Sequence, residues 1–129
     1  MTIVIRGVRG ATTVKENRAE EIWEETERVL REMIAENHIT ADQVSHIWFT
    51  VTSDLNAAFP AKAAREIPGW EFVPVMCAQE IPVPGSLEKC IRVMMTADVK
   101  VPAKDVQHVF LNEAVALRPD LGLTKQNDS

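Results

Sequence analysis

The chain has 129 residues, of which 46% are hydrophobic and 26% are charged, and its formal net charge at pH 7 is −5. These values are typical of one globular domain and exclude a disordered chain, a fibrous repeat or a disulfide-rich miniprotein. A negative net charge also makes nucleic acid and anionic membranes poor candidates as partners. No apolar run approaches the roughly 18 residues of a membrane span, and the N-terminus lacks a signal-peptide pattern. We therefore expect a soluble cytoplasmic protein.

The two cysteines, Cys77 and Cys90, and the three histidines form no metal-binding spacing such as CxxC or HxxxH. A reducing cytoplasm also disfavours a disulfide between the two thiols. We therefore expect neither a bound metal nor a disulfide in this protein.

The first predicted elements are a short strand and a long helix. Residues 2–6 are β-prone, and the glycine-containing run of residues 7–13 is expected to end that strand. Residues 18–36 form the clearest helix, because apolar side chains recur there at i, i+3 and i+4 on one face. The acidic residues of the other face indicate a solvent-exposed surface. Two i, i+4 ion pairs are predicted on it: Glu24 with Arg28, and Glu27 with Arg31.

Four more strands and a short helix are predicted after the long helix. The strands are residues 44–52, 72–77, 91–97 and 106–112, and the short helix is residues 60–66. Pro74 indicates that part of its strand lies at a sheet edge or a bulge. Residues 118–129 are polar, and we expect them to form a loose C-terminal tail.

These elements predict a single α+β domain over residues 1–129, with one mixed sheet of about five strands and the long helix covering one face. Some sheet surface then stays uncovered on the other face. Trp48, Met94 and Phe110 are the side chains that we expect to meet a partner subunit there. The protein is therefore expected to be an oligomer.

Arginine placement is the main chemical signal in the residues themselves, since no G-x-S-x-G or P-loop motif is present. Arg92 lies in the middle of a predicted strand, opposite the face formed by its apolar neighbours. Burying a guanidinium without a partner is costly, so Arg92 needs an anion, either a structural carboxylate or a ligand. Arg9 lies between two glycines, and Lys62 and Arg65 share one side of a helical turn.

Several runs of the sequence are distinctive. They are IRGVRGATT at residues 5–13, ENH at 36–38, FPAKA at 59–63, GW at 69–70, VPV at 73–75, KCIRVMMT at 89–96 and LRPDL at 117–121. On these runs the chain resembles the AroH-class monofunctional chorismate mutases of the Bacillus subtilis type. The resemblance covers essentially the whole chain without large insertions.

The resemblance implies conversion of chorismate to prephenate, the branch-point step towards phenylalanine and tyrosine. It implies a homotrimer with a pseudo-α/β-barrel arrangement, active sites between adjacent subunits, and no cofactor or metal. The reaction is an intramolecular Claisen rearrangement, which breaks a C–O bond and forms a C–C bond in one concerted step. Such a reaction needs no nucleophile and no proton transfer, so the absence of nucleophile motifs does not argue against it.

The resemblance also implies the residues of the site. Arg9 would bind a substrate carboxylate, Arg92 would meet the ether oxygen and a carboxylate, and Glu80 would accept a hydrogen bond from the ring hydroxyl. The other implied substrate contacts are Phe59, Lys62, Arg65, Val75, Met76, Cys77, Phe110, Leu117 and Arg118. Among these, Cys77 would lie beside the ring hydroxyl, the apolar residues would form walls, and the basic residues would lie nearer the mouth.

Two details of this set need comment. Cys77 and Glu80 are three residues apart and cannot share a face of one regular strand, so the strand must bend or end between them. The family commonly has a tyrosine where this chain has Phe110, and the chain has no tyrosine. We expect Phe110 to act as a wall, without the hydroxyl hydrogen bond.

Two other function classes are compatible with a trimer of this kind. One is a non-catalytic module that binds an aromatic-pathway metabolite, which loss of Arg92 or Glu80 would have favoured. The other is an imine deaminase of the reactive-intermediate type, which also holds a carboxylate with an interface arginine. The retained arginine and glutamate argue against the first class, and the full-length resemblance argues against the second.

Overall fold

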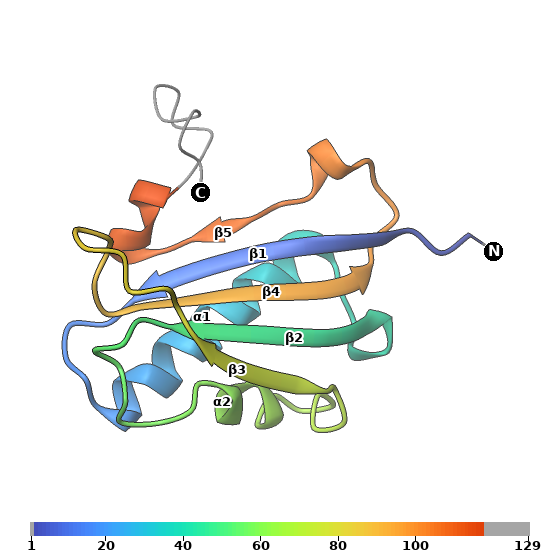
Figure 1. Ribbon diagram of the computed structural model, residues 1–129. Coiled ribbons are helices and arrows are strands. Elements are labelled where there is room, and N and C mark those ends of the chain that lie inside the picture. Colours follow the sequence, from blue (N-terminus) through green and yellow to red (C-terminus); the bar gives the residue numbers. More distant parts are fainter. Residues whose placement is uncertain (1, 118–129) are drawn as a thin grey trace.

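The computed structural model describes residues 2–117, so the predicted C-terminal tail lies outside the described residues. Five strands form one mixed sheet in the order β3-β2-β4-β1-β5, which Figure 1 shows from β5 at the top to β3 at the bottom. The strands are β1 (Ile5–Thr13), β2 (Val44–Val51), β3 (Val75–Gln79), β4 (Cys90–Asp98) and β5 (Val109–Phe110). The β1–β4 and β2–β4 pairs are antiparallel, and the β1–β5 and β2–β3 pairs are parallel. The predicted mixed sheet is confirmed.

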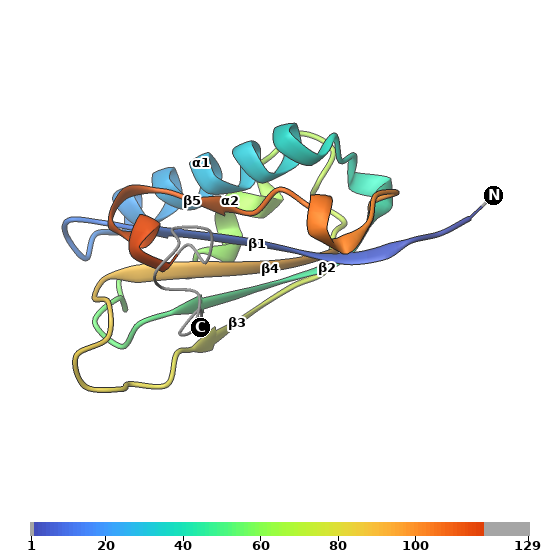
Figure 2. The ribbon, with the colours of Figure 1, turned by 90° about the horizontal axis from the view of Figure 1, so that it is seen from above.

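Both helices, α1 (Ala19–Asn37) and α2 (Ala61–Arg65), lie on one face of the sheet, as Figure 2 shows from above. The predicted amphipathic face of α1 is confirmed, because its buried side chains recur at helical spacing. They are Ile22, Thr26, Val29, Leu30 and Met33. Val29, Leu30 and Met33 form the main core with inward-facing strand residues such as Phe49 and Met95, and Ile22 packs in a second cluster.

Of the two ion pairs predicted on α1, one is confirmed and one is wrong. Arg31 Nε lies 2.7 Å from Glu27 Oε2. Arg28 instead pairs with Glu25 at 2.8 Å, and the same nitrogen lies 3.4 Å from Asn112 Oδ1 on a neighbouring segment, which favours this side of the helix.

The prediction that the glycines of residues 7–13 end the first strand is wrong. The strand β1 runs through both of them, from Ile5 to Thr13. Gly10 lies on the helix-covered face, where an added Cβ would collide with Met33 and lie 3.2 Å from Val29. This glycine therefore allows α1 to pack closely on β1 rather than forming a turn.

The strand predicted at residues 72–77 is displaced towards the C-terminus, and the strand predicted at residues 106–112 is shortened. Residues before Pro74 form successive turns, with the Val73 N–H donating to the Trp70 carbonyl, so β3 begins at Val75. At the other segment only Val109 and Phe110 pair with β1. The Gln107 N–H donates to the side chain of Asn37 instead of to a strand.

The face opposite the helices is open, and exposed apolar side chains lie on it. The exposed fractions of Trp48 and Met94 are 41% and 43%, and that of Met76 on β3 is 59%. The predicted uncovered sheet surface is thus confirmed for Trp48 and Met94, while Phe110 is half-buried. Among residues 2–117, no helix has the length and apolar character to cross a membrane.

Candidate active site

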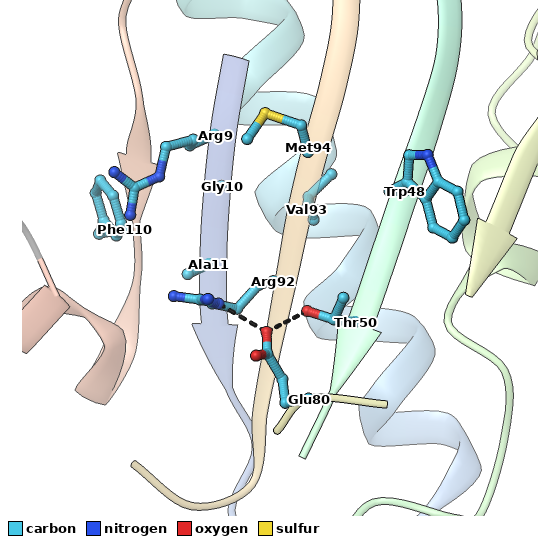
Figure 3. Close-up of a pocket in the computed structure, with 10 residues that line it drawn as sticks. All are labelled: Arg9, Gly10, Ala11, Trp48, Thr50, Glu80, Arg92, Val93, Met94 and Phe110. Atoms are coloured by element: carbon cyan, nitrogen blue, oxygen red, sulfur yellow. Dashed lines mark hydrogen bonds and ion pairs between the residues drawn. The ribbon is translucent and has the colours of Figure 1, made fainter. Parts of the chain in front are cut away.

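A cavity of about 370 Å³ lies on the open face of the sheet. It is bordered by β1, β2, β4 and β5 and by the residue that follows β3, as the close-up in Figure 3 shows. Ten residues line it: Arg9, Gly10, Ala11, Trp48, Thr50, Glu80, Arg92, Val93, Met94 and Phe110. The three residues expected to be catalytic from the resemblance are all among them.

Strand register explains why these side chains meet. Arg9 pairs with Met94, and Met94 pairs with Trp48, so these three form one row across β1, β4 and β2. Two residues further along each strand, Ala11, Arg92 and Thr50 form the next row. Residues two apart on a strand share a face, so both rows point into the same cavity. Arg9 and Arg92 are therefore diagonal neighbours on the open face.

Glu80 is the anion that Arg92 requires. The Arg92 Nε donates to Glu80 Oε2 at 2.8 Å. The hydroxyl of Thr50, on the strand between them, donates to the same oxygen. Partial burial by itself raises the pKa of Glu80, but the hydrogen bonds from Thr50 and Arg92 and the Arg92 charge outweigh it and lower the pKa. Glu80 is thus ionised at neutral pH.

This pairing leaves polar atoms of both residues available. Within residues 2–117, neither Nη1 nor Nη2 of Arg92 has a hydrogen-bond partner, and no donor lies on Glu80 Oε1. The Arg92 side chain is still 36% exposed. An Arg fork with two unoccupied nitrogens can bind a carboxylate or another oxyanion, and a free carboxylate oxygen can accept a hydroxyl donor.

Arg9 and Phe110 form the other wall of the cavity. The guanidinium carbon of Arg9 lies 5.4 Å from the centre of the Phe110 ring, within the range of a cation–π contact. Figure 3 shows the two side chains beside each other, across β1 from Glu80 and Thr50. The predicted role of Phe110 as a wall therefore has a geometric basis here.

The strand β3 ends at Gln79, as the spacing of Cys77 and Glu80 required. The Glu80 N–H still donates to the Val51 carbonyl at 2.9 Å, so the backbone stays close to β2 while the side chain enters the cavity. Cys77 and Val75 lie on the other face, half-buried against the core beneath the helices. Met76 lies on the open face, paired in register with Trp48.

The remaining implied residues that lie within residues 2–117 do not line this cavity in a single chain. Phe59 is 74% exposed in the segment before α2. Lys62 lies on α2, 3.2 Å from Glu66 and 4.0 Å from the centre of the Trp23 ring, and Arg65 is exposed one turn further on. Leu117, the last described residue, ends the 3₁₀ turn η3 (Asn112–Leu117). Arg118 lies outside the described residues.

The sequence interpretation missed Thr50 as a site residue. Its position two residues after Trp48 was a usable signal, because alternation places both side chains on one face of the predicted strand. Nothing in a single sequence, however, indicated that this strand lies between those that carry Glu80 and Arg92. Among the described residues, no three His, Cys, Asp or Glu side chains are grouped so that they could hold a metal ion.

Comparisons with known proteins agree with this geometry. A family model described as chorismate mutase type I matches residues 5–121. The chain belongs to the type I chorismate mutases. The chorismate mutase AroH of Bacillus subtilis strain 168 is 50% identical to it over 126 residues, which are 98% of this chain and 99% of that protein. The AroH of Thermus thermophilus is 47% identical over 119 residues, covering 92% of this chain and 97% of that protein.

The fold of this chorismate mutase is also found in a solved relative. A chorismate mutase from Clostridium thermocellum superposes with a TM-score of 0.83 and is 53% identical, covering 85% of this chain and 97% of that one. At this identity the likeness extends beyond the fold. The module that only binds a metabolite and the imine deaminase are therefore set aside.

Proposed function

We propose that this chorismate mutase converts chorismate to prephenate in the cavity on its open sheet face, with Arg92 as the main catalytic residue. The observation that carries the proposal is the state of the Arg92 guanidinium. Its Nε is fixed by Glu80 at 2.8 Å, while Nη1 and Nη2 have no partner within residues 2–117. A cation held in this way meets a developing negative charge without having to reorganise.

The reaction class determines what such a site must do. In the Claisen rearrangement the ether C–O bond breaks as a new C–C bond forms, and negative charge develops on the ether oxygen. Arg92 would stabilise that oxygen through Nη1 and Nη2, which have no partner within residues 2–117. Holding the enolpyruvyl arm over the ring in a chair-like geometry would lower the entropic part of the barrier. Neither task needs a nucleophile or a proton acceptor.

Glu80 would have two tasks in this reaction. Its Oε2 fixes Arg92 and is in turn held by Thr50. Its Oε1 has no donor in the described part of the chain and would accept the hydrogen bond of the ring hydroxyl. A lowered pKa keeps the carboxylate ionised and therefore able only to accept. Arg9 would bind a substrate carboxylate beside the Phe110 wall.

The charges of the cavity support the proposal that a second copy of the chain contributes to the site. Chorismate is a dianion, whereas the described residues that line the cavity include two cations, Arg9 and Arg92, and one anion, Glu80. Lys62 and Arg65 are exposed elsewhere on the surface. We propose a homotrimer in which an adjacent copy brings these cations to the mouth, together with the other implied contacts. The exposed apolar side chains of Trp48, Met76 and Met94 support the proposal that an adjacent copy covers the open face.

The additional contacts in this proposal are residues that do not line the cavity within residues 2–117, together with Arg118, which lies outside the described residues. They are Phe59, Lys62, Arg65, Val75, Met76, Cys77, Leu117 and Arg118. We propose that Phe59 and Leu117 act as apolar walls. The expected place of Cys77 beside the ring hydroxyl does not fit a single chain, because its side chain lies on the helix-covered face, opposite the cavity. A cytoplasmic location and the absence of a cofactor belong to the same proposal.

A subunit-mixing experiment tests both the reaction and the shared site. Purified Arg92→Ala and Phe59→Asp proteins are each expected to lose activity, measured as the ultraviolet loss of chorismate. If the two residues of one site come from different chains, mixed trimers regain part of the wild-type rate. A fully active monomer in sedimentation analysis would refute the shared site, and an inactive, well-folded wild type would refute the reaction.

A further inference from the structure

A side chain outside the cavity contacts the backbone of a residue inside it. The Arg9 N–H donates to Nδ1 of His108 at 2.9 Å. His108 directly precedes β5, whose two residues, Val109 and Phe110, pair with Gly10 and Ala11 of β1. The imidazole thus accepts the Arg9 N–H in the place of the backbone carbonyl that a longer β5 would have offered.

This contact links the two residues of one cavity wall. β5 is only two residues long and pairs with Gly10 and Ala11 of β1, and beyond it the Leu111 N–H donates to the Ala11 carbonyl at 2.9 Å. The histidine bond therefore fixes the start of β5 against β1. Arg9 and Phe110, whose guanidinium and ring lie 5.4 Å apart, stand on the two strands that it joins.

The bond requires a particular form of the imidazole. Nδ1 can accept only when it carries no proton, so His108 must be the neutral tautomer with its proton on Nε2. Burial and the Arg9 charge lower the pKa of His108, which favours this form at neutral pH. Among the described residues, Glu32 and Glu36 of α1 are the acidic groups that line the same surface hollow as His108.

We infer that His108 is a positioning residue for this chorismate mutase. Through Nδ1 it holds the Arg9 backbone and so fixes the Arg9 guanidinium against Phe110, where the proposed function has Arg9 bind a substrate carboxylate. The inference rests on that proposed function. A carboxylate contact made equally in substrate and transition state affects KM more than kcat.

Asparagine and glutamine give a matched pair of variants. The Oδ1 of asparagine is as many bonds from the backbone as Nδ1 of histidine, whereas the Oε1 of glutamine is one bond further and corresponds to the wrong side of the ring. We expect His108→Gln to raise KM about three- to tenfold with little change in kcat, the size of one lost hydrogen bond. His108→Asn should stay within about twofold of wild type.

Two controls make the result decisive. Placed in an Arg9→Ala protein, His108→Gln should raise KM no further if it acts through Arg9. Hydrogen exchange of the Arg9 amide, which needs no turnover, should be faster in His108→Gln and as slow as wild type in His108→Asn. Equal KM and equal exchange in the glutamine and asparagine proteins would overturn the inference. An inactive wild type with the expected exchange pattern would instead overturn only the proposed function.

Discussion

Arg92 and Glu80 form an ion pair across a strand that belongs to neither of them. Arg92 lies on β4 and Glu80 follows β3, and β2 separates these strands in the sheet. The 2.8 Å bond between them passes over Thr50 of β2, whose hydroxyl donates to the same carboxylate oxygen. Three strands are thereby joined at the base of the cavity, and the Arg92 guanidinium is fixed in place.

Thr50 offers a direct test of this arrangement. Thr50→Val keeps the shape of the side chain but removes the hydroxyl that donates to Glu80. A hydrogen bond to a charged group contributes roughly 1.5–3 kcal/mol, so kcat/KM should fall about tenfold or more. Thr50→Ser keeps the donor and should lose less than about threefold. Equal rates in the valine and serine proteins would show that the hydroxyl does not position Glu80.

The ion pair also predicts a pH dependence of stability. The pKa of Glu80 is below its ordinary value of 4.5 in the folded protein, so the folded state favours the ionised carboxylate. The resulting stabilisation is complete above the unfolded pKa and is lost as the pH falls through the folded pKa. Denaturant unfolding of wild type and Glu80→Gln should therefore differ by a constant free energy near neutral pH, and this difference should shrink below about pH 4.5. A constant difference down to pH 3 would contradict the prediction.

Phe110 is the position at which this chain differs from the tyrosine that is common in the family. We expect Phe110→Tyr to be tolerated, because the ring stays beside Arg9 and only a hydroxyl is added at the half-buried wall. A new neutral hydrogen bond is worth about 0.5–1.5 kcal/mol, so KM for chorismate should fall modestly. Loss of activity in a well-folded Phe110→Tyr protein would mean that this wall is shaped differently from the proposed site.

Activity should also survive chelation. The proposed mechanism uses the charge of Arg92 and needs no Lewis acid. We therefore expect the same rate of chorismate loss before and after dialysis against EDTA. Abolition by the chelator, with recovery on adding a divalent ion, would rule out the metal-free mechanism.

Sequence periodicity was sufficient to predict the elements in which buried residues recur at a regular spacing. The amphipathic face of α1 and the alternation of β4 have the predicted periods, and the mid-strand position of Arg92 correctly implied an anionic partner. Of the two alternatives for that partner, the structure shows the structural carboxylate, because Glu80 binds Nε. Within residues 2–117 the other two nitrogens have no partner, and the ligand alternative stays a prediction for them.

Long-range packing was not predictable in the same way. Gly10 was expected to break β1, but the close approach of Met33 from α1 is what requires a glycine there. The strand predicted at residues 106–112 was too long, because only Val109 and Phe110 pair with β1, and the preceding His108 contacts β1 through its side chain. The positions of Phe59 and Lys62 relative to the cavity would depend on a second copy of the chain.

The central claim is that the positive charge of Arg92 stabilises the ether oxygen as its negative charge develops. Citrulline at position 92 keeps nearly the same shape and planar donors without the charge. Removing one preorganised electrostatic donor typically lowers the rate about 10²–10³-fold, and a desolvated full charge should cost at least as much.

Arg92→Lys provides the complementary variant. It keeps the charge but loses the planar fork and the reach, so it should also be strongly impaired. The lysine protein thus tests the geometry of the cation, whereas the citrulline protein tests its charge alone.

The most direct measurement is therefore kcat and KM of the protein with citrulline at position 92, assayed beside wild type by ultraviolet loss of chorismate. We predict that kcat collapses by at least about two orders of magnitude while KM changes much less. A citrulline protein that works nearly as well as wild type would contradict the account, and would leave restriction of the substrate's conformation as the main source of catalysis.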